Sequence, residues 1–162
     1  MKINTHEEIS FTNCHAGIYL SKKEGTIAVE FKSSEIVLYL NTFLYQSLAW
    51  LLQNALDNKQ LMDFVNWTAD PKAALTNTLI ELHGPEHSVC LACVPKHERV
   101  QLNFEIGASI DLKFSDFKGL VELVSEAQND LEWRRCLLQW AFTSDVSEHF
   151  KNNNDSKNQK SL

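Results

Sequence analysis

The sequence predicts an α+β fold of two tandem β-β-β-α-α units, packed as a pseudo-twofold pair with an antiparallel sheet and helices on one face. Short segments that alternate apolar and polar residues indicate strands, and longer segments with a helical apolar period follow them. The same order of segments returns about 73 residues further along the chain. The chain has 162 residues, 44% of them apolar, which is enough for one domain with a proper core.

The first unit begins with strands. Residues 25–32, GTIAVEFK, alternate between an apolar and a mixed face, and residues 35–40, EIVLYL, follow after a short Lys-Ser-Ser turn. Residues 15–21, HAGIYLS, precede them, and residues 7–13 are a further candidate strand. These segments predict a meander of antiparallel strands.

Two helical segments follow. Asn41 or Thr42 can begin the first, over residues 43–56, because a side-chain oxygen at that position accepts a hydrogen bond from a free backbone amide. Residues 59–67 form the second, which ends before Pro71. Residues 72–82 then predict a helical turn that passes into a strand near residue 79.

The second unit is predicted from pairs of similar residues that lie 73 positions apart in the sequence. The matched pairs have similar side chains in the same order: Ile18 with Leu91, Ile27 with Val100, Val29 with Leu102, Phe31 with Phe104, Leu48 with Val121 and Trp67 with Trp140. With one inserted residue, Asn41 matches Ser115, a second candidate helix cap. Any two amphipathic strands match at period two, but chance does not readily supply the shared order. We therefore predict an internal duplication.

The predicted boundaries follow from this repeat. One domain is expected over residues 1–146, with repeats at about 5–77 and 78–146. Residues 147–162 are almost entirely polar and cannot bury enough surface to offset the entropy of ordering, so a flexible tail is expected there.

Composition narrows the function classes. The formal net charge is −6, which argues against a nucleic-acid partner, because such binding depends on clustered Lys and Arg. The N-terminal residues resemble neither a signal peptide nor a transit peptide, and no apolar run is long enough to span a membrane. We expect a cytoplasmic protein with no membrane partner, whose four cysteines remain thiols.

Residues 83–97, HGPEHSVCLACVPKH, are rich in histidine and cysteine. Cys90 and Cys93 have a spacing common among zinc ligands. In an extended strand, however, they point to opposite faces, and Leu91-Ala92 offers no turn residue between them. The segment therefore predicts a buried strand with histidines at its ends, in which a free Cys behaves as a small apolar residue.

A metal or thiol site remains an alternative. The duplication places Cys14 and His15 opposite His87 and Ser88, so a pseudo-twofold axis could bring together Cys14, His15, His87 and Cys90 as zinc ligands. For the simpler chelate at Cys90 and Cys93, His87 and His97 are flanking histidines and His83 is a spare one. A thiol enzyme would need a lowered cysteine pKa, and no catalytic residues are assigned, because phosphate-binding and serine-nucleophile motifs are absent from the sequence.

The leading hypothesis is a protein-binding subunit or adaptor. The first repeat carries more apolar residues at its outer positions than the second, and its first helix is apolar nearly all round. Either the second repeat covers these apolar residues, or the residues bind another chain in a homo-oligomer or a hetero-complex. The candidate partner-binding residues are Val37, Tyr39, Tyr45, Trp50 and Trp67. A third hypothesis is a small-ligand pocket at the repeat junction, between Trp67 and Trp140.

Overall fold

The computed structural model describes residues 1–66 and 79–140 and has an α+β fold with two antiparallel sheets. The first sheet has the strand order β1-β2-β3-β4-β5, and the second has the order β6-β7-β8-β9. The strands of the first sheet are β1 (Lys2–Asn4), β2 (Glu8–Thr12), β3 (Ala16–Ser21), β4 (Ile27–Phe31) and β5 (Ile36–Leu40). Those of the second are β6 (Ile80–His83), β7 (Val89–Val94), β8 (Arg99–Phe104) and β9 (Ser109–Lys113).

Helices follow each sheet. They are α1 (Thr42–Asp57), α2 (Lys59–Val65), α4 (Phe114–Gln128) and a helical segment at residues 131–140, while two short 3-10 turns, η1 (Pro85–His87) and η2 (Pro95–His97), lie on either side of β7. The predicted cap at Asn41 is confirmed, since its Oδ1 accepts from the backbone N–H of Leu44 at 2.8 Å. The second predicted cap is wrong. α4 begins at Phe114, so Ser115 lies inside the helix, and no side chain caps it.

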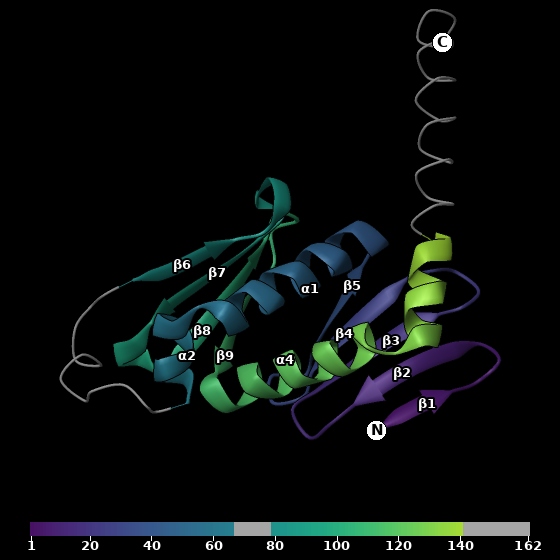
Figure 1. Cartoon of the computed structure of the whole chain (residues 1–162), viewed down its shortest axis with the longest axis horizontal. Coiled ribbons are helices and arrows are strands. Elements are labelled where there is room, and N and C mark those ends of the chain that lie inside the picture. The colour runs from purple at the N-terminus through teal and green to yellow at the C-terminus, as the bar shows by residue number, and fades with distance from the viewer. Residues whose placement is uncertain (67–78, 141–162) are drawn as a thin grey trace, which may run out of the picture.

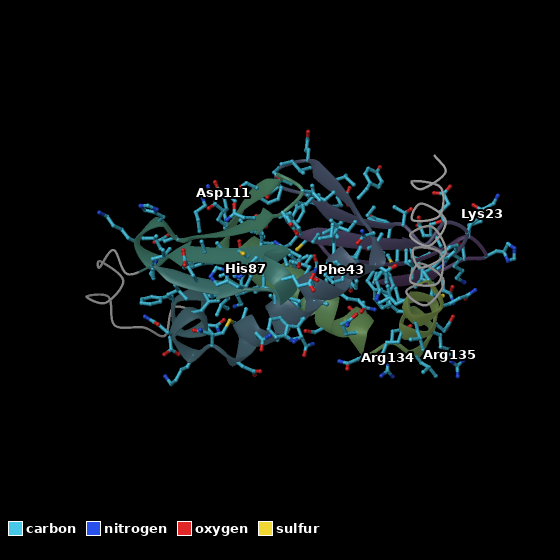
Figure 2. All side chains as sticks on the ribbon, turned by 90° about the horizontal axis from the view of Figure 1, so that it is seen from above. Lys23, Phe43, His87, Asp111, Arg134 and Arg135 are labelled. Atoms are coloured by element: carbon cyan, nitrogen blue, oxygen red, sulfur yellow. The ribbon has the colours of Figure 1, made fainter. Side chains whose placement is uncertain are left out.

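The helices lie together on one side of the two sheets (Figures 1 and 2). α1 contacts β6 and β7 of the second sheet, whereas α4 contacts β2 and β3 of the first sheet as well as β8 and β9 of its own. α1 and α4 also contact each other. Each unit therefore supplies a helix that covers the sheet of the other unit, and the two units share one core.

The two units have the same order of elements. The series β2-β3-β4-β5-α1-α2 in the first unit corresponds to β6-β7-β8-β9-α4 and residues 131–140 in the second. Ala16 starts β3 and Val89 starts β7, 73 positions later, as the repeat predicts. β1 was not predicted, and the part of the second unit that the structure describes, from residue 79 on, holds no counterpart to it. The shared order does not test whether the units arose by duplication, which stays a prediction.

Trp133, on the helical segment 131–140, lies at the centre of the first unit. Its side chain is fully buried, and its ring packs edge-on against Phe11 of β2 and Tyr45 of α1, with centroid distances of 5.6 and 5.5 Å. The segment from the second unit therefore completes the core around the first sheet.

Some predicted features lie outside the described residues. These are the repeat boundary at 77/78, Trp67 and the polar segment 147–162. Within the described ranges, none of the helices combines the length and the apolar character needed to span a membrane.

Candidate functional site

β5 is one of the two outer strands of the first sheet and carries exposed apolar residues. It pairs with β4 along one edge, and no strand among residues 1–66 and 79–140 pairs with its other edge. Val37 is 41% exposed and Tyr39 is 71% exposed. Both side chains face away from the helices, because they alternate along the strand with Leu38 and Leu40, which pack toward the core. We call Ile36, Val37 and Tyr39 the β5 surface.

The β5 surface continues across the outer face of the first sheet. The register places Tyr39 beside Ala28, and Ala28 beside Tyr19 of β3. The Tyr19 ring lies over Gly17, where a Cβ would overlap it, and its hydroxyl donates to Glu30 at 3.1 Å. The outer face beside β5 therefore has a tyrosine ring on either side of Ala28, and Glu30 lies next to Val37.

β9 is the corresponding strand of the second sheet and has a different outer face. Its outward residues are Ser109, Asp111 and Lys113, all of them exposed and polar or charged. Gln101 and Asn103 of β8 lie beside Asp111 and Ser109 and are joined to Ser109 by side-chain hydrogen bonds. Charged side chains on an outer strand discourage pairing with another chain, and β5 lacks them.

The remaining predicted partner-binding residues lie elsewhere. Tyr45 is completely buried in α1 against Trp133, which contradicts its assignment to an exposed surface. Burial raises the pKa of the Tyr45 hydroxyl, which donates to Gln128 Oε1 at 3.4 Å. Trp50 is 52% exposed and lines a shallow groove between α1 and the end of α4, together with amide side chains such as Gln53 and Asn129. The surface predicted as one unit is therefore divided.

A second candidate site lies at the turn between β6 and β7. His83 and Cys90 are paired directly across these two strands, so their side chains emerge on the same face. Nδ1 of His83 is 3.1 Å from Sγ of Cys90 and 3.4 Å from Nδ1 of His87. The two imidazole rings meet edge-on at a centroid distance of 5.0 Å. We call His83, His87 and Cys90 the His/Cys cluster.

The turn that carries His87 is tight. Glu86 and His87 have φ values of 54° and 56°, in the left-handed region that non-glycine residues rarely adopt. Gly84 N–H donates to Val89 O at 2.7 Å, and the Ser88 hydroxyl donates to Pro85 O at 2.7 Å. Side chains and backbone together therefore hold this turn in one conformation, with His87 beside His83.

The structure divides the predicted zinc ligands between two places. His87 and Cys90 come together, and His83, which the sequence argument left as a spare residue, joins them. Cys14 and His15 are not part of this cluster, because His15 pairs with Asp116 of α4. The signal for His83 was present in the sequence, since an antiparallel pair joined by a short turn places residues near the turn opposite each other.

Cys90 and Cys93 point to opposite faces of β7, as predicted. The strand alternates between buried and half-buried residues, and Cys93 is buried in the core. Burial raises the pKa of the Cys93 thiol to about 11. The outer face of β7 is half-buried, so the strand is less enclosed than the sequence suggests.

Cys93 is expected to resist alkylation in the folded protein. A pKa near 11, compared with an ordinary value of 9.0, leaves the thiolate population at pH 8 about 100-fold lower than that of an ordinary thiol, and burial also blocks access. Peptide mapping after brief iodoacetamide treatment should show modified Cys14, which is exposed, and unmodified Cys93. Comparable modification of both under native conditions contradicts this assignment, and denatured protein, in which all four thiols react, is the control.

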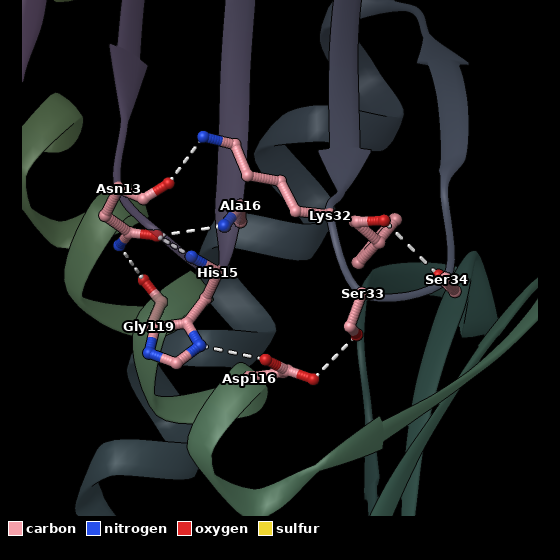
Figure 3. Close-up of polar contacts among 9 residues, drawn as sticks. Asn13, His15, Ala16, Lys32, Ser33, Ser34, Asp116 and Gly119 are labelled. Atoms are coloured by element: carbon pink, nitrogen blue, oxygen red, sulfur yellow. Dashed lines mark hydrogen bonds and ion pairs between the residues drawn. The ribbon is translucent and has the colours of Figure 1, made fainter.

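Polar contacts join α4 to the turns of the first sheet (Figure 3). In the first turn of α4, Oδ1 of Asp116 pairs with Nδ1 of His15 at 2.8 Å, and Oδ2 accepts from the Ser33 hydroxyl at 2.8 Å. Asn13 donates to the carbonyl of Gly119 at 2.8 Å. The His15 ring packs against Gly119, where any Cβ would overlap it.

Burial raises the pKa of Asp116, but hydrogen bonds from His15 and Ser33 and the nearby charges of His15 and Lys113 outweigh it. The net result is a pKa below the usual carboxyl value. In a serine triad the imidazole lies between the hydroxyl and the carboxylate, whereas here the carboxylate lies between the other two groups. Ser33 therefore lies beside a carboxylate of lowered pKa, which is a weak base, rather than beside an imidazole. These polar contacts join the two units.

The predicted ligand pocket between two tryptophans is only partly described. Trp140 packs against Gly25 in the turn between β3 and β4, where φ is 73° and a Cβ would overlap the indole. Trp67 lies outside the described residues. The ring of Trp140 therefore covers a turn, and the pocket itself stays a prediction.

These features define the class: an α+β protein with two sheets, in which the long helix of each unit contacts the sheet of the other. It has an apolar outer strand and a histidine–cysteine cluster. Comparisons with protein-family models, with curated proteins and with solved structures found no match to this chain.

Proposed function

We propose that this protein is a cytosolic protein-binding subunit or adaptor that binds an extended segment of another polypeptide along β5. The observation that carries the proposal is the β5 surface: β5 pairs with no strand along its second edge among residues 1–66 and 79–140, and its outward residues are Val37 and Tyr39. A free strand edge offers backbone donors and acceptors to an added strand, and neighbouring side chains give specificity.

The contrast with β9 supports this proposal. Both strands end their sheets and both lead into a long helix, but the positions of Val37 and Tyr39 correspond to Asp111 and Lys113 in β9. Soluble proteins commonly protect outer strands with charges, so an apolar outer strand is typical of a surface that another chain covers. Tyrosine also buries a large area with few rotatable bonds, which favours it in interfaces.

The experiment is site-specific photocrosslinking in the cells that naturally make the protein. A benzophenone amino acid replaces Tyr39 in one variant and Lys113, the matched position on β9, in the control variant. We expect a crosslinked partner from position 39 and little or none from position 113. Mass spectrometry then shows whether the partner is a second copy of this chain or a different protein.

Charges introduced on the β5 surface should weaken partner binding. The double variant Val37→Asp, Tyr39→Lys copies the outward face of β9 onto β5 and is expected to weaken partner binding by at least about 30-fold, corresponding to about 2 kcal/mol for an aromatic hot spot. Its melting temperature should change little, because both side chains are exposed. Equal crosslinking from positions 39 and 113, or unchanged affinity in the double variant, would refute the proposal.

A further inference from the structure

The His/Cys cluster points to a second site, and we propose that His83, His87 and Cys90 bind one zinc ion on the outer face of the second sheet. Their donor atoms all lie within 4.8 Å of one another. Within residues 1–66 and 79–140, no other three His, Cys, Asp or Glu side chains lie so close together. The inference does not depend on the β5 surface, which belongs to the other sheet.

The distances are close to those around a tetrahedral ion. Zinc–nitrogen bonds of about 2.1 Å and zinc–sulfur bonds of about 2.3 Å place two nitrogen ligands about 3.4 Å apart and a nitrogen and a sulfur about 3.6 Å apart. The two His Nδ1 atoms are 3.4 Å apart, and Nδ1 of His83 is 3.1 Å from Sγ of Cys90. The donor atoms of His87 and Cys90 lie within 4.8 Å of each other, so side-chain rotations that bring these two atoms closer would place all three donors at bonding distance.

Hydrogen bonding alone does not satisfy this arrangement. An imidazole nitrogen has either one hydrogen or one lone pair in the ring plane. Nδ1 of His83 therefore makes one good hydrogen bond, yet it lies close to both Cys90 and His87. A cation between the three atoms accepts a lone pair from each and satisfies them together.

The donor set selects zinc among the common divalent ions. Imidazole nitrogen and thiolate sulfur suit zinc, whereas magnesium and calcium prefer oxygen ligands. Cys90 binds as the thiolate and releases its proton to solvent. Glu81 Oε2 lies 3.8 Å from Nε2 of His83, the ring nitrogen left free for an outer-shell carboxylate.

The scaffold holds the donors before the ion arrives. His83 and Cys90 lie on paired strands, and the hydrogen-bonded turn described above fixes His87. His83 and His87 are exposed, so a hydrated ion can reach the cluster and keep a water molecule in the fourth position.

The test uses the full chain, reduced with a phosphine and freed of metal by a chelator, and titrated calorimetrically with zinc. We expect one ion per chain and a higher melting temperature in the bound protein. Cobalt in place of zinc should give tetrahedral visible bands and a thiolate-to-cobalt charge-transfer band. Cys90→Ser and His83→Gln should each lower the zinc affinity by more than about 100-fold, which exceeds the loss typical of a residue that only hydrogen-bonds to a ligand. Cys90→Ser should also abolish the charge-transfer band. Glu81→Gln should lower the zinc affinity by about 10-fold.

Two variants serve as matched controls. Cys14→Ser removes an exposed thiol outside the cluster, and His97→Gln removes an exposed histidine from the turn after β7. Both should bind zinc within about two-fold of the wild-type affinity, since neither residue belongs to the donor set. The proposal is overturned if the wild-type chain does not bind zinc, if the charge-transfer band persists in Cys90→Ser, or if the control variants lose as much zinc affinity as the cluster variants.

Discussion

Trp133→Ala is expected to lower the free energy of unfolding by about 3–5 kcal/mol, the range for removing a large buried aromatic side chain. The substitution leaves a cavity between Phe11 of β2 and Tyr45 of α1, which now pack edge-on against the indole. Because small domains are stable by only about 5–15 kcal/mol, the variant should be close to the limit of folding.

The effect can be measured by urea unfolding, followed by circular dichroism and compared with Leu138→Ala. Leu138 lies on the same helical segment but is 70% exposed, so its loss should change stability by less than about 0.5 kcal/mol. Trp133→Phe, which keeps part of the ring, should fall between the two. Equal stability of the Trp133→Ala and Leu138→Ala variants would contradict the central place given to Trp133.

Asp116→Ala is expected to have the next largest effect, about 2–3 kcal/mol at pH 7. Its carboxylate pairs with His15 and accepts from the Ser33 hydroxyl, and hydrogen bonds to a charged group contribute more than those between neutral groups. The carboxylate also lies in the first turn of α4, where the helix dipole favours a negative charge. Its loss should loosen the contact between α4 and the turns of the first sheet.

The contribution of Asp116 should depend on pH with a defined sign. The pKa of Asp116 is lower in the folded chain than the ordinary value of 3.8, so the unfolded chain takes up the proton first as pH falls. The stabilisation is therefore complete well above pH 4 and is lost as pH falls through the folded pKa. The difference in unfolding free energy between wild type and Asp116→Ala should shrink across this window.

Asp111→Asn is the matched control for this experiment. Asp111 is an exposed carboxylate on β9, next to the start of α4, and its substitution should change stability by less than about 0.5 kcal/mol. If the wild-type and Asp116→Ala chains differ by the same amount at pH 7 and pH 3, the carboxylate of Asp116 does not provide the stabilisation.

Local patterns account for most of the elements that were predicted correctly. The alternation in residues 25–32 predicted β4, because the side chains of a strand alternate between two faces, and the apolar run at residues 35–40 after a short turn predicted β5. The same rule separated Cys90 from Cys93. The cap at Asn41 was predictable because it involves a backbone amide only three residues away. β1, which has three exposed residues, gave no comparable signal.

The sites were harder to predict. α1 has no charged residue before Asp57, so its sequence did not show which side faces water, and Tyr45 was assigned to the surface although it is buried. Val37 and Tyr39 were identified as outward residues because the repeat matches them to Asp111 and Lys113, the polar outer positions of the second unit. Asp116 was not singled out, since its partners His15 and Ser33 lie 101 and 83 residues away along the chain.

The sequence alone determined the α+β class, the succession of strands and then helices in each unit, the opposite faces of Cys90 and Cys93 and the apolar character of β5, although it predicted three strands in each unit where five and four are found. Each of these features depends on residues that are close together in the sequence. Only the tertiary structure decided that α1 and α4 cover each other's sheets, that His83 rather than Cys14 or His15 joins His87 and Cys90, and that Asp116 links the two units. These contacts depend on strand register and helix docking. Both are set by the packing of residues far apart in sequence, for which no local pattern carries the information.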